Sequence, residues 1–114
     1  MYKIYHNPRC KKSRAGLKYL ETKGLAFEIK KYLDEGLEEQ ELKDLMKMLG
    51  KKPLEMVRKQ EDVYKKNYKG KEFSDDEWIR IIAENPKLLN RPVIVHNGKA
   101  VWGDPPENID EIID

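Results

Sequence analysis

The sequence has a single cysteine among its 114 residues, and this scarcity excludes several kinds of site. One thiol cannot form a disulfide within the chain, nor can it supply a zinc site built from several cysteines. The chain has only two histidines, so we expect no bound metal. A chain without an internal disulfide is typical of a reducing compartment, and we expect the protein to be cytoplasmic.

Long apolar runs and an excess of charge of one sign are also missing. No apolar run approaches the length of about 20 residues that spans a membrane, and no signal-like segment opens the chain. The 23 basic and 21 acidic residues give a net charge of only +2, which is too balanced to indicate nucleic-acid binding. We therefore expect one soluble domain of residues 1–114, monomeric and without a membrane or nucleic-acid partner.

Hydrophobic patterning in the first third of the chain predicts a strand, a helix and a second strand. The strands are expected at residues 1–5 and 26–31, and the helix at residues 11–23, with Gly24 just past its end. The side chains expected to face the core are Ala15, Leu17, Tyr19 and Leu20 in the helix and Phe27 and Ile29 in the strand. This order predicts parallel strands joined by a right-handed crossover.

The middle of the chain reads as helical. An apolar stripe predicts a helix ending at Gly50, and Pro53 suits the first turn of a short helix. Residues 59–72 are rich in Lys, Glu and Tyr and are predicted to be a loop. Residues 74–77 form a capping box, which begins a helix that the Asn-Pro step at residues 85–86 ends.

Near the C-terminus, two β-rich segments flank an Asn-Gly pair at residues 97–98, a pattern that favours a hairpin of residues 93–95 and 100–102. The Pro-Pro pair at residues 105–106 is expected to open a terminal helix. The whole order predicts an α/β protein with a four-stranded mixed sheet. A helical insertion at about residues 35–88 separates the βαβ and ββα halves, an arrangement of the thioredoxin-like type.

Cys10 lies where the first strand gives way to the first helix, surrounded by Arg9, Lys11, Lys12 and Arg14. The positive end of the helix dipole, free backbone N–H groups and nearby cations all favour a thiolate there. The same features would hold a small oxyanion beside the sulfur. The alternative is a buried structural cysteine, because free cysteine is among the most buried residue types.

Three neighbours of Cys10 are candidates for a supporting role. His6 could tune the thiol or move protons, or it could simply pack and form hydrogen bonds at the end of its strand. Ser13, one helical turn after Cys10, could donate its hydroxyl to the thiolate, or it could be an ordinary first-turn residue. The charge of Arg14 is a further candidate for thiol tuning.

Four segments together resemble the ArsC/Spx family of glutaredoxin-linked arsenate reductases and their relatives. These segments are residues 5–14 (YHNPRCKKSR), 57–59 (VRK), 89–95 (LNRPVIV) and 103–108 (GDPPEN). The resemblance covers essentially the whole chain, and the order and spacing of the segments are those of the family.

The resemblance implies a chemical role for several residues. Cys10 matches the nucleophile that attacks the arsenic atom of arsenate, and Arg58 and Arg91 match arginines that hold the oxyanion. Arg91 precedes a proline that is cis in related structures, and Ser13 stands where other members carry a second cysteine. The adduct is then resolved from outside by glutathione and glutaredoxin, with no bound cofactor.

One position departs from the family pattern, because Asp104 stands where many members carry a third arginine. A carboxylate there would repel an anionic substrate if it faces the site. The departure gives weight to an alternative activity, a glutathione-dependent thiol–disulfide reductase. A more distant alternative is a non-catalytic regulator that binds RNA polymerase, as Spx proteins do, although Ser13 removes the second cysteine of their redox switch.

Overall fold

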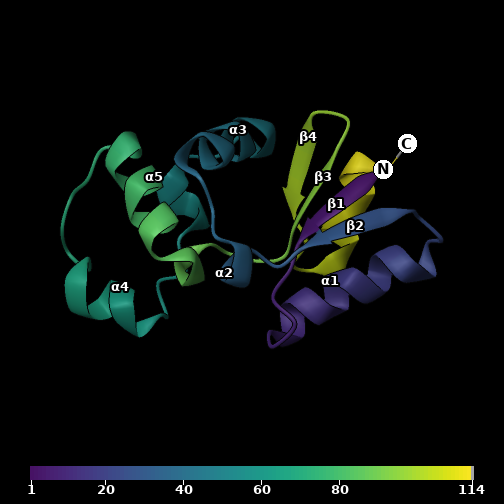
Figure 1. The fold of residues 1–114 in the computed structure, drawn as a ribbon, viewed down its shortest axis with the longest axis horizontal. Helices are drawn as coiled ribbons and strands as arrows, with labels where there is room; N and C mark the ends of the chain where they lie inside the picture. The colour runs from purple at the N-terminus through teal and green to yellow at the C-terminus, as the bar shows by residue number, and fades with distance from the viewer. Residues whose placement is uncertain (114) are drawn as a thin grey trace. The chain divides into compact units, whose positions relative to one another are not determined.

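The computed structural model describes residues 1–113, which divide into two units. The first unit joins Met1–Glu35 to Arg91–Asp114 and contains the sheet, whereas the second, Gly36–Asn90, is helical (Figure 1). The insertion predicted at about residues 35–88 overlaps this second unit. None of the helices in residues 1–113 combines the length and apolar character needed to span a membrane.

The sheet of the first unit has four strands in the order β2-β1-β3-β4. They are β1 (Tyr2–Tyr5), β2 (Phe27–Lys30), β3 (Val93–His96) and β4 (Lys99–Trp102). The central strand β1 pairs in parallel with β2 and antiparallel with β3, and β3 pairs antiparallel with β4. The predicted α/β fold with a mixed four-stranded sheet of the thioredoxin-like type is confirmed.

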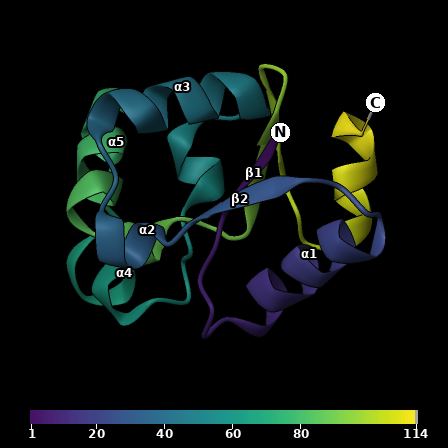
Figure 2. The ribbon, with the colours of Figure 1, turned by 45° about the vertical axis from the view of Figure 1, so that its right-hand side comes forward.

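Helix α1 (Lys11–Thr22) provides the crossover between the two parallel strands. Gly24 follows it with a φ of +69°, the left-handed conformation expected of a residue just past a helix end. Figure 2 shows α1 beside the C-terminal segment η3 (Pro106–Ile112), and the two pack against each other. Between them and the sheet lies a core of Tyr2, Ile4, Leu20, Ile94, Val101, Ile109 and Ile112.

Some details of this layer differ from the predictions. Ala15 is exposed, and the helix instead buries Ser13 and Gly16 beside Leu20. Ile29 is 44% exposed in the short strand β2. The terminal helix, predicted after the prolines, is a 3-10 helix. Apolar periodicity thus located the elements but not the small residues at their points of closest approach.

The predicted hairpin is present, and its turn has the chemistry that the Asn-Gly pair indicated. Asn97 and Gly98 have φ values of +50° and +74°, as a two-residue turn of type I′ requires. At the far end of the hairpin, the N–H of Gly103 donates to the carbonyl of Pro92 at 2.9 Å. The hairpin therefore brings the segment after β4 beside the segment before β3.

Short helices follow β2 and make up the second unit. Helix α2 (Tyr32–Glu35), which the sequence did not predict, ends the N-terminal part of the first unit. The second unit contains the following helical segments: α3 (Glu39–Leu49), η1 (Pro53–Met56), α4 (Asp62–Asn67), α5 (Asp75–Glu84) and η2 (Pro86–Leu88). In the predicted capping box, Ser74 Oγ accepts from the N–H of Glu77 at 3.2 Å, and the Glu77 carboxylate accepts from the N–H of Ser74 at 2.9 Å.

The loop predicted for residues 59–72 is partly wrong, because α4 lies within it. Tyr64 and Tyr68 place their rings 6.3 and 6.1 Å from the ring of Trp78, and Phe73 lies 5.1 Å from it. An aromatic cluster within the second unit thus stabilises a helix whose own sequence is mostly polar.

Candidate functional site

Cys10 occupies the N-cap of α1, with φ −95° and ψ 122°. The turn that leads to it is held locally: the N–H of Cys10 donates to the carbonyl of Asn7 at 3.0 Å, and the Asn7 side chain accepts from the N–H of Arg9 at 3.0 Å. This Asx-type turn aims the chain into the helix. Cys10 is half-buried rather than enclosed in the core, which argues against the structural alternative.

The thiol of Cys10 is set to ionise more readily than a free cysteine. Burial of the sulfur raises its pKa, but the donor groups near it, namely the backbone N–H of Ser13, the Arg91 guanidinium and the backbone N–H of Lys12, outweigh that effect. The net result is a lowered pKa. Among the residues that the structure describes, the Cys10 side chain forms no cap hydrogen bond, so the N–H groups that begin α1 favour the thiolate through their positive dipole ends.

Arg91 is far from Cys10 in the sequence, and it reaches Cys10 from the segment just before β3. Its side chain is only 7% exposed, and the following peptide bond to Pro92 is cis, as the resemblance implied. Its carbonyl accepts from Trp102 Nε1 at 3.2 Å. A Cβ on Gly16 would lie 2.6 Å from Cγ of Pro92, so α1 packs directly on this segment. The buried guanidinium is thus held in place beside the sulfur.

His6 and Ser13 form a buried pair beneath Cys10. His6 Nδ1 lies 2.7 Å from Ser13 Oγ, and that oxygen also accepts from the N–H of Asn7 at 2.9 Å. Burial, and then the charges of Lys31 and Arg14, lower the pKa of His6, which favours its neutral form. The Ser13 hydroxyl therefore bonds to the loop before Cys10, and it is the Ser13 backbone N–H that lowers the Cys10 pKa.

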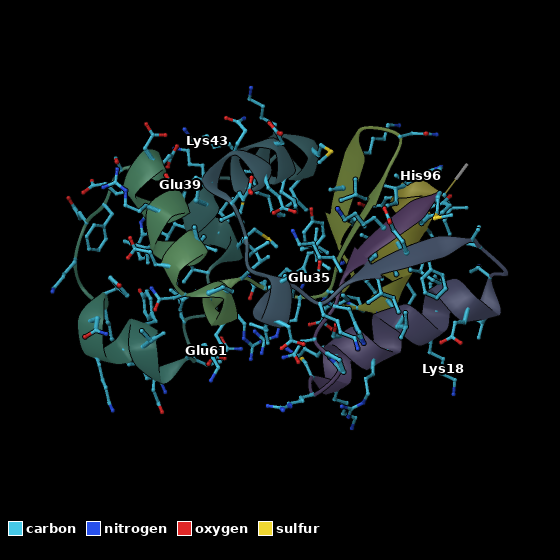
Figure 3. All side chains as sticks on the ribbon, in the orientation of Figure 1. Lys18, Glu35, Glu39, Lys43, Glu61 and His96 are labelled. Carbon is cyan, nitrogen blue, oxygen red and sulfur yellow. The ribbon has the colours of Figure 1, made fainter. Side chains whose placement is uncertain are left out.

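The other two predicted arginines have different surroundings. Arg14 Nη1 donates to the carbonyl of Pro8 at 2.9 Å, and the Arg14 charge acts on His6. Arg58 belongs to the second unit, where its Nε pairs with Glu61 Oε2 at 3.0 Å (Glu61 is labelled in Figure 3). The contribution of Arg58 to oxyanion binding stays a prediction from the resemblance.

Asp104 faces α1, where it forms an ion pair that the sequence did not predict. One of its carboxylate oxygens lies 3.3 Å from Nζ of Lys12, two residues after Cys10. Both side chains reach solvent, Lys12 at 54% exposure and Asp104 at 26%. The carbonyl of Asp104 accepts from Asn108 Nδ2 at 3.2 Å, and the bond to Pro105 is also cis. The sequence signalled this position only as an aspartate in place of a family arginine.

No group of three or more His, Cys, Asp or Glu side chains suitable for a metal ion occurs within residues 1–113. The groups gathered around Cys10 in the first unit are its own thiol, the buried Arg91 guanidinium and the amides that begin α1. A thiolate held by such donors can attack an electrophilic centre, and the same donors attract an anion.

The chain is similar to known proteins over nearly its full length. The model of the ArsC family matches residues 5–112. An arsenate reductase of Neisseria meningitidis is 44% identical over 113 residues, covering 97% of each chain, and one of Haemophilus influenzae is 38% identical over 112 residues, covering 96% of this chain and 97% of the relative.

A solved structure gives the same result for the fold. The structure of an arsenate reductase from Vibrio cholerae superposes with a TM-score of 0.93 at 43% identity, covering 98% of this chain and 97% of the other. The family match, the sequence relatives and the shared fold agree with one another. The chain belongs to the ArsC family and is an oxidoreductase of that family.

Proposed function

We propose that the protein reduces arsenate, with Cys10 as the nucleophile and glutathione and glutaredoxin as the external reductants. The observation that carries the proposal is the position of Cys10 at the N-cap of α1 beside the buried Arg91 guanidinium, a position that lowers the pKa of the thiol. Relatives named arsenate reductase at 44% identity support the choice of substrate.

The first step joins sulfur to arsenic. Arsenate carries negative charge at neutral pH, so an approaching thiolate meets repulsion that fixed cationic donors must offset. Arg91 suits this role, because a guanidinium presents a planar fork of N–H groups to two oxygens at once. The Cys10 thiolate attacks arsenic, an As–S bond forms, an As–O bond breaks, and the oxygen leaves as water after protonation.

The reducing electrons come from outside the chain. Cys10 is the only cysteine, so two external thiols supply the two electrons and become a disulfide. The As–S bond to Cys10 then breaks, which frees the Cys10 thiolate and releases arsenic as arsenite. The half-buried sulfur at the start of a helix is open to such an exchange. We place the reaction in the cytoplasm, where glutathione is kept reduced. No bound cofactor takes part in this scheme.

The test is arsenate-dependent oxidation of NADPH in the presence of glutathione, glutaredoxin and glutathione reductase. We expect turnover that depends on all three thiol components and that disappears in the Cys10→Ser variant. The variant Glu111→Gln, which changes an exposed carboxylate in the same unit, serves as the matched control. If the wild type shows no turnover above the Cys10→Ser variant, the proposal is wrong.

Asp104 favours a second candidate, a glutathione-dependent thiol–disulfide reductase. Its carboxylate lies on the side of α1 that carries Lys12, and it cancels one positive charge that an arsenate site would use. Activity on a glutathionylated protein, without any arsenate turnover, would select this function.

A further inference from the structure

Lys12 and Asp104 form a solvent-accessible pair of opposite charges at the first turn of α1. Lys12 lies in the first turn of α1, two residues after the nucleophile. Asp104 is held there by its neighbour Gly103, whose N–H donates at 2.9 Å to the carbonyl of Pro92, next to Arg91. An ammonium and a carboxylate therefore pair where the end of the hairpin meets the first turn of α1, the turn that follows Cys10.

This pair is separate from the groups that stabilise the thiolate. The side chain of Arg91 and the backbone N–H groups of Ser13 and Lys12 act on the sulfur, whereas the ammonium of Lys12 is directed to Asp104. Such exposed ion pairs contribute only about 0–1 kcal/mol to stability, so a ligand can separate them at low cost. A carboxylate here repels a plain oxyanion, but it suits a ligand that carries both an ammonium and a carboxylate.

We propose that Lys12 and Asp104 bind the α-amino-acid group of glutathione, with its ammonium on Asp104 and its carboxylate on Lys12. The thiol of the tripeptide is then directed to the Cys10 side of the site. This inference rests on the proposed function for its choice of glutathione as the resolving thiol. It makes Asp104 a specificity-determining residue for the reductant.

The experiment measures thiol exchange directly and needs no arsenate. The Cys10 thiolate attacks one sulfur of a disulfide, forms a mixed disulfide and releases the other half as a thiolate. The two disulfide probes are oxidised glutathione and the disulfide of deaminoglutathione (glutaryl-Cys-Gly), which keeps the carboxylate and lacks only the α-ammonium. The rate of mixed-disulfide formation is followed by intact-protein mass spectrometry for each probe.

We expect wild-type protein to react about 2- to 5-fold faster with oxidised glutathione than with the deamino probe, because one partly exposed charge contact is lost. In Asp104→Asn the ratio should fall to about 1, and in the control Glu111→Gln it should stay at the wild-type value. A change in thiol reactivity alone affects both probes equally and leaves the ratio unchanged. Lys12→Gln should slow both probes and keep their ratio, since both retain the carboxylate.

Equal rates with both probes in the wild type, or an unchanged ratio in Asp104→Asn, would overturn the inference and leave the pair as an ordinary surface contact. The outcome is independent of the proposed function. A protein that lacks arsenate turnover but keeps the rate ratio disproves only arsenate reduction. A protein that turns over arsenate without the ratio disproves only this binding site.

Discussion

Replacing Ser13 with alanine removes a hydroxyl that joins the His6 ring to the backbone of the loop before Cys10. Ser13 is fully buried, and its Oγ lies 2.7 Å from His6 Nδ1 and 2.9 Å from the N–H of Asn7. The substitution leaves both groups without this partner. A buried polar group left unsatisfied costs about 1–3 kcal/mol, so we expect the loss of two such partners to lower the free energy of unfolding by about 2–6 kcal/mol.

Urea denaturation measures this loss, with the slope of the transition compared between variants to confirm the same unfolding reaction. Thr22→Ala is the matched control, because it removes an exposed hydroxyl from the same helix and should change stability by at most about 0.5 kcal/mol. In folded Ser13→Ala protein, the pH midpoint of Cys10 alkylation should stay low, because the backbone N–H at position 13 remains. A stability equal to that of Thr22→Ala would show that these two hydrogen bonds contribute nothing to folding. A clear rise in the alkylation midpoint would show that the hydroxyl acts on the thiolate.

Three further predictions concern the surroundings of this site. Gly16→Ala gains about 1 kcal/mol of helix propensity, but its Cβ would lie 2.6 Å from Cγ of Pro92, so urea denaturation should show a net loss of stability. The control Lys18→Ala, which shortens an outward-pointing side chain of the same helix (Figure 3), should be nearly neutral. Arg91→Gln removes a charge-assisted hydrogen bond worth about 1.5–3 kcal/mol, so kcat/KM for arsenate should fall roughly 10- to 150-fold, and a change within twofold would refute the assignment. Burial lowers the pKa of His6, so the contribution of the neutral His6 to the free energy of unfolding is fully present above the unfolded histidine pKa of about 6.5. This contribution should decrease as the pH falls from there toward the lower native pKa. The decrease, measured by urea denaturation at each pH, should be smaller in His6→Asn.

The sequence predicted correctly those turns, helix starts and crossovers that depend on residues close together in the chain. The capping box at residues 74–77, the Asn-Gly turn and the βαβ crossover each depend on a few neighbouring residues, and each is present. The helix α4 was missed because rings outside it, above all that of Trp78, stabilise its polar sequence. Its formation therefore depends on packing that a local window does not contain.

In the site, too, the sequence predicted the local features and missed a contact between distant residues. Cys10 and the donors of its helix start follow from the strand-to-helix junction, and Arg91 follows from the resemblance. The contact between Lys12 and Asp104, 92 positions apart, required the register of the hairpin and the packing of Gly16 on Pro92. No periodicity in the sequence specifies such a contact.

The most direct test of the central claim is the rate of Cys10 alkylation by iodoacetamide as a function of pH, measured with and without arsenate. We expect a midpoint below that of an ordinary cysteine thiol, and slower alkylation when arsenate occupies the donors around the sulfur. A midpoint at or above the ordinary value, with no response to arsenate, would contradict it.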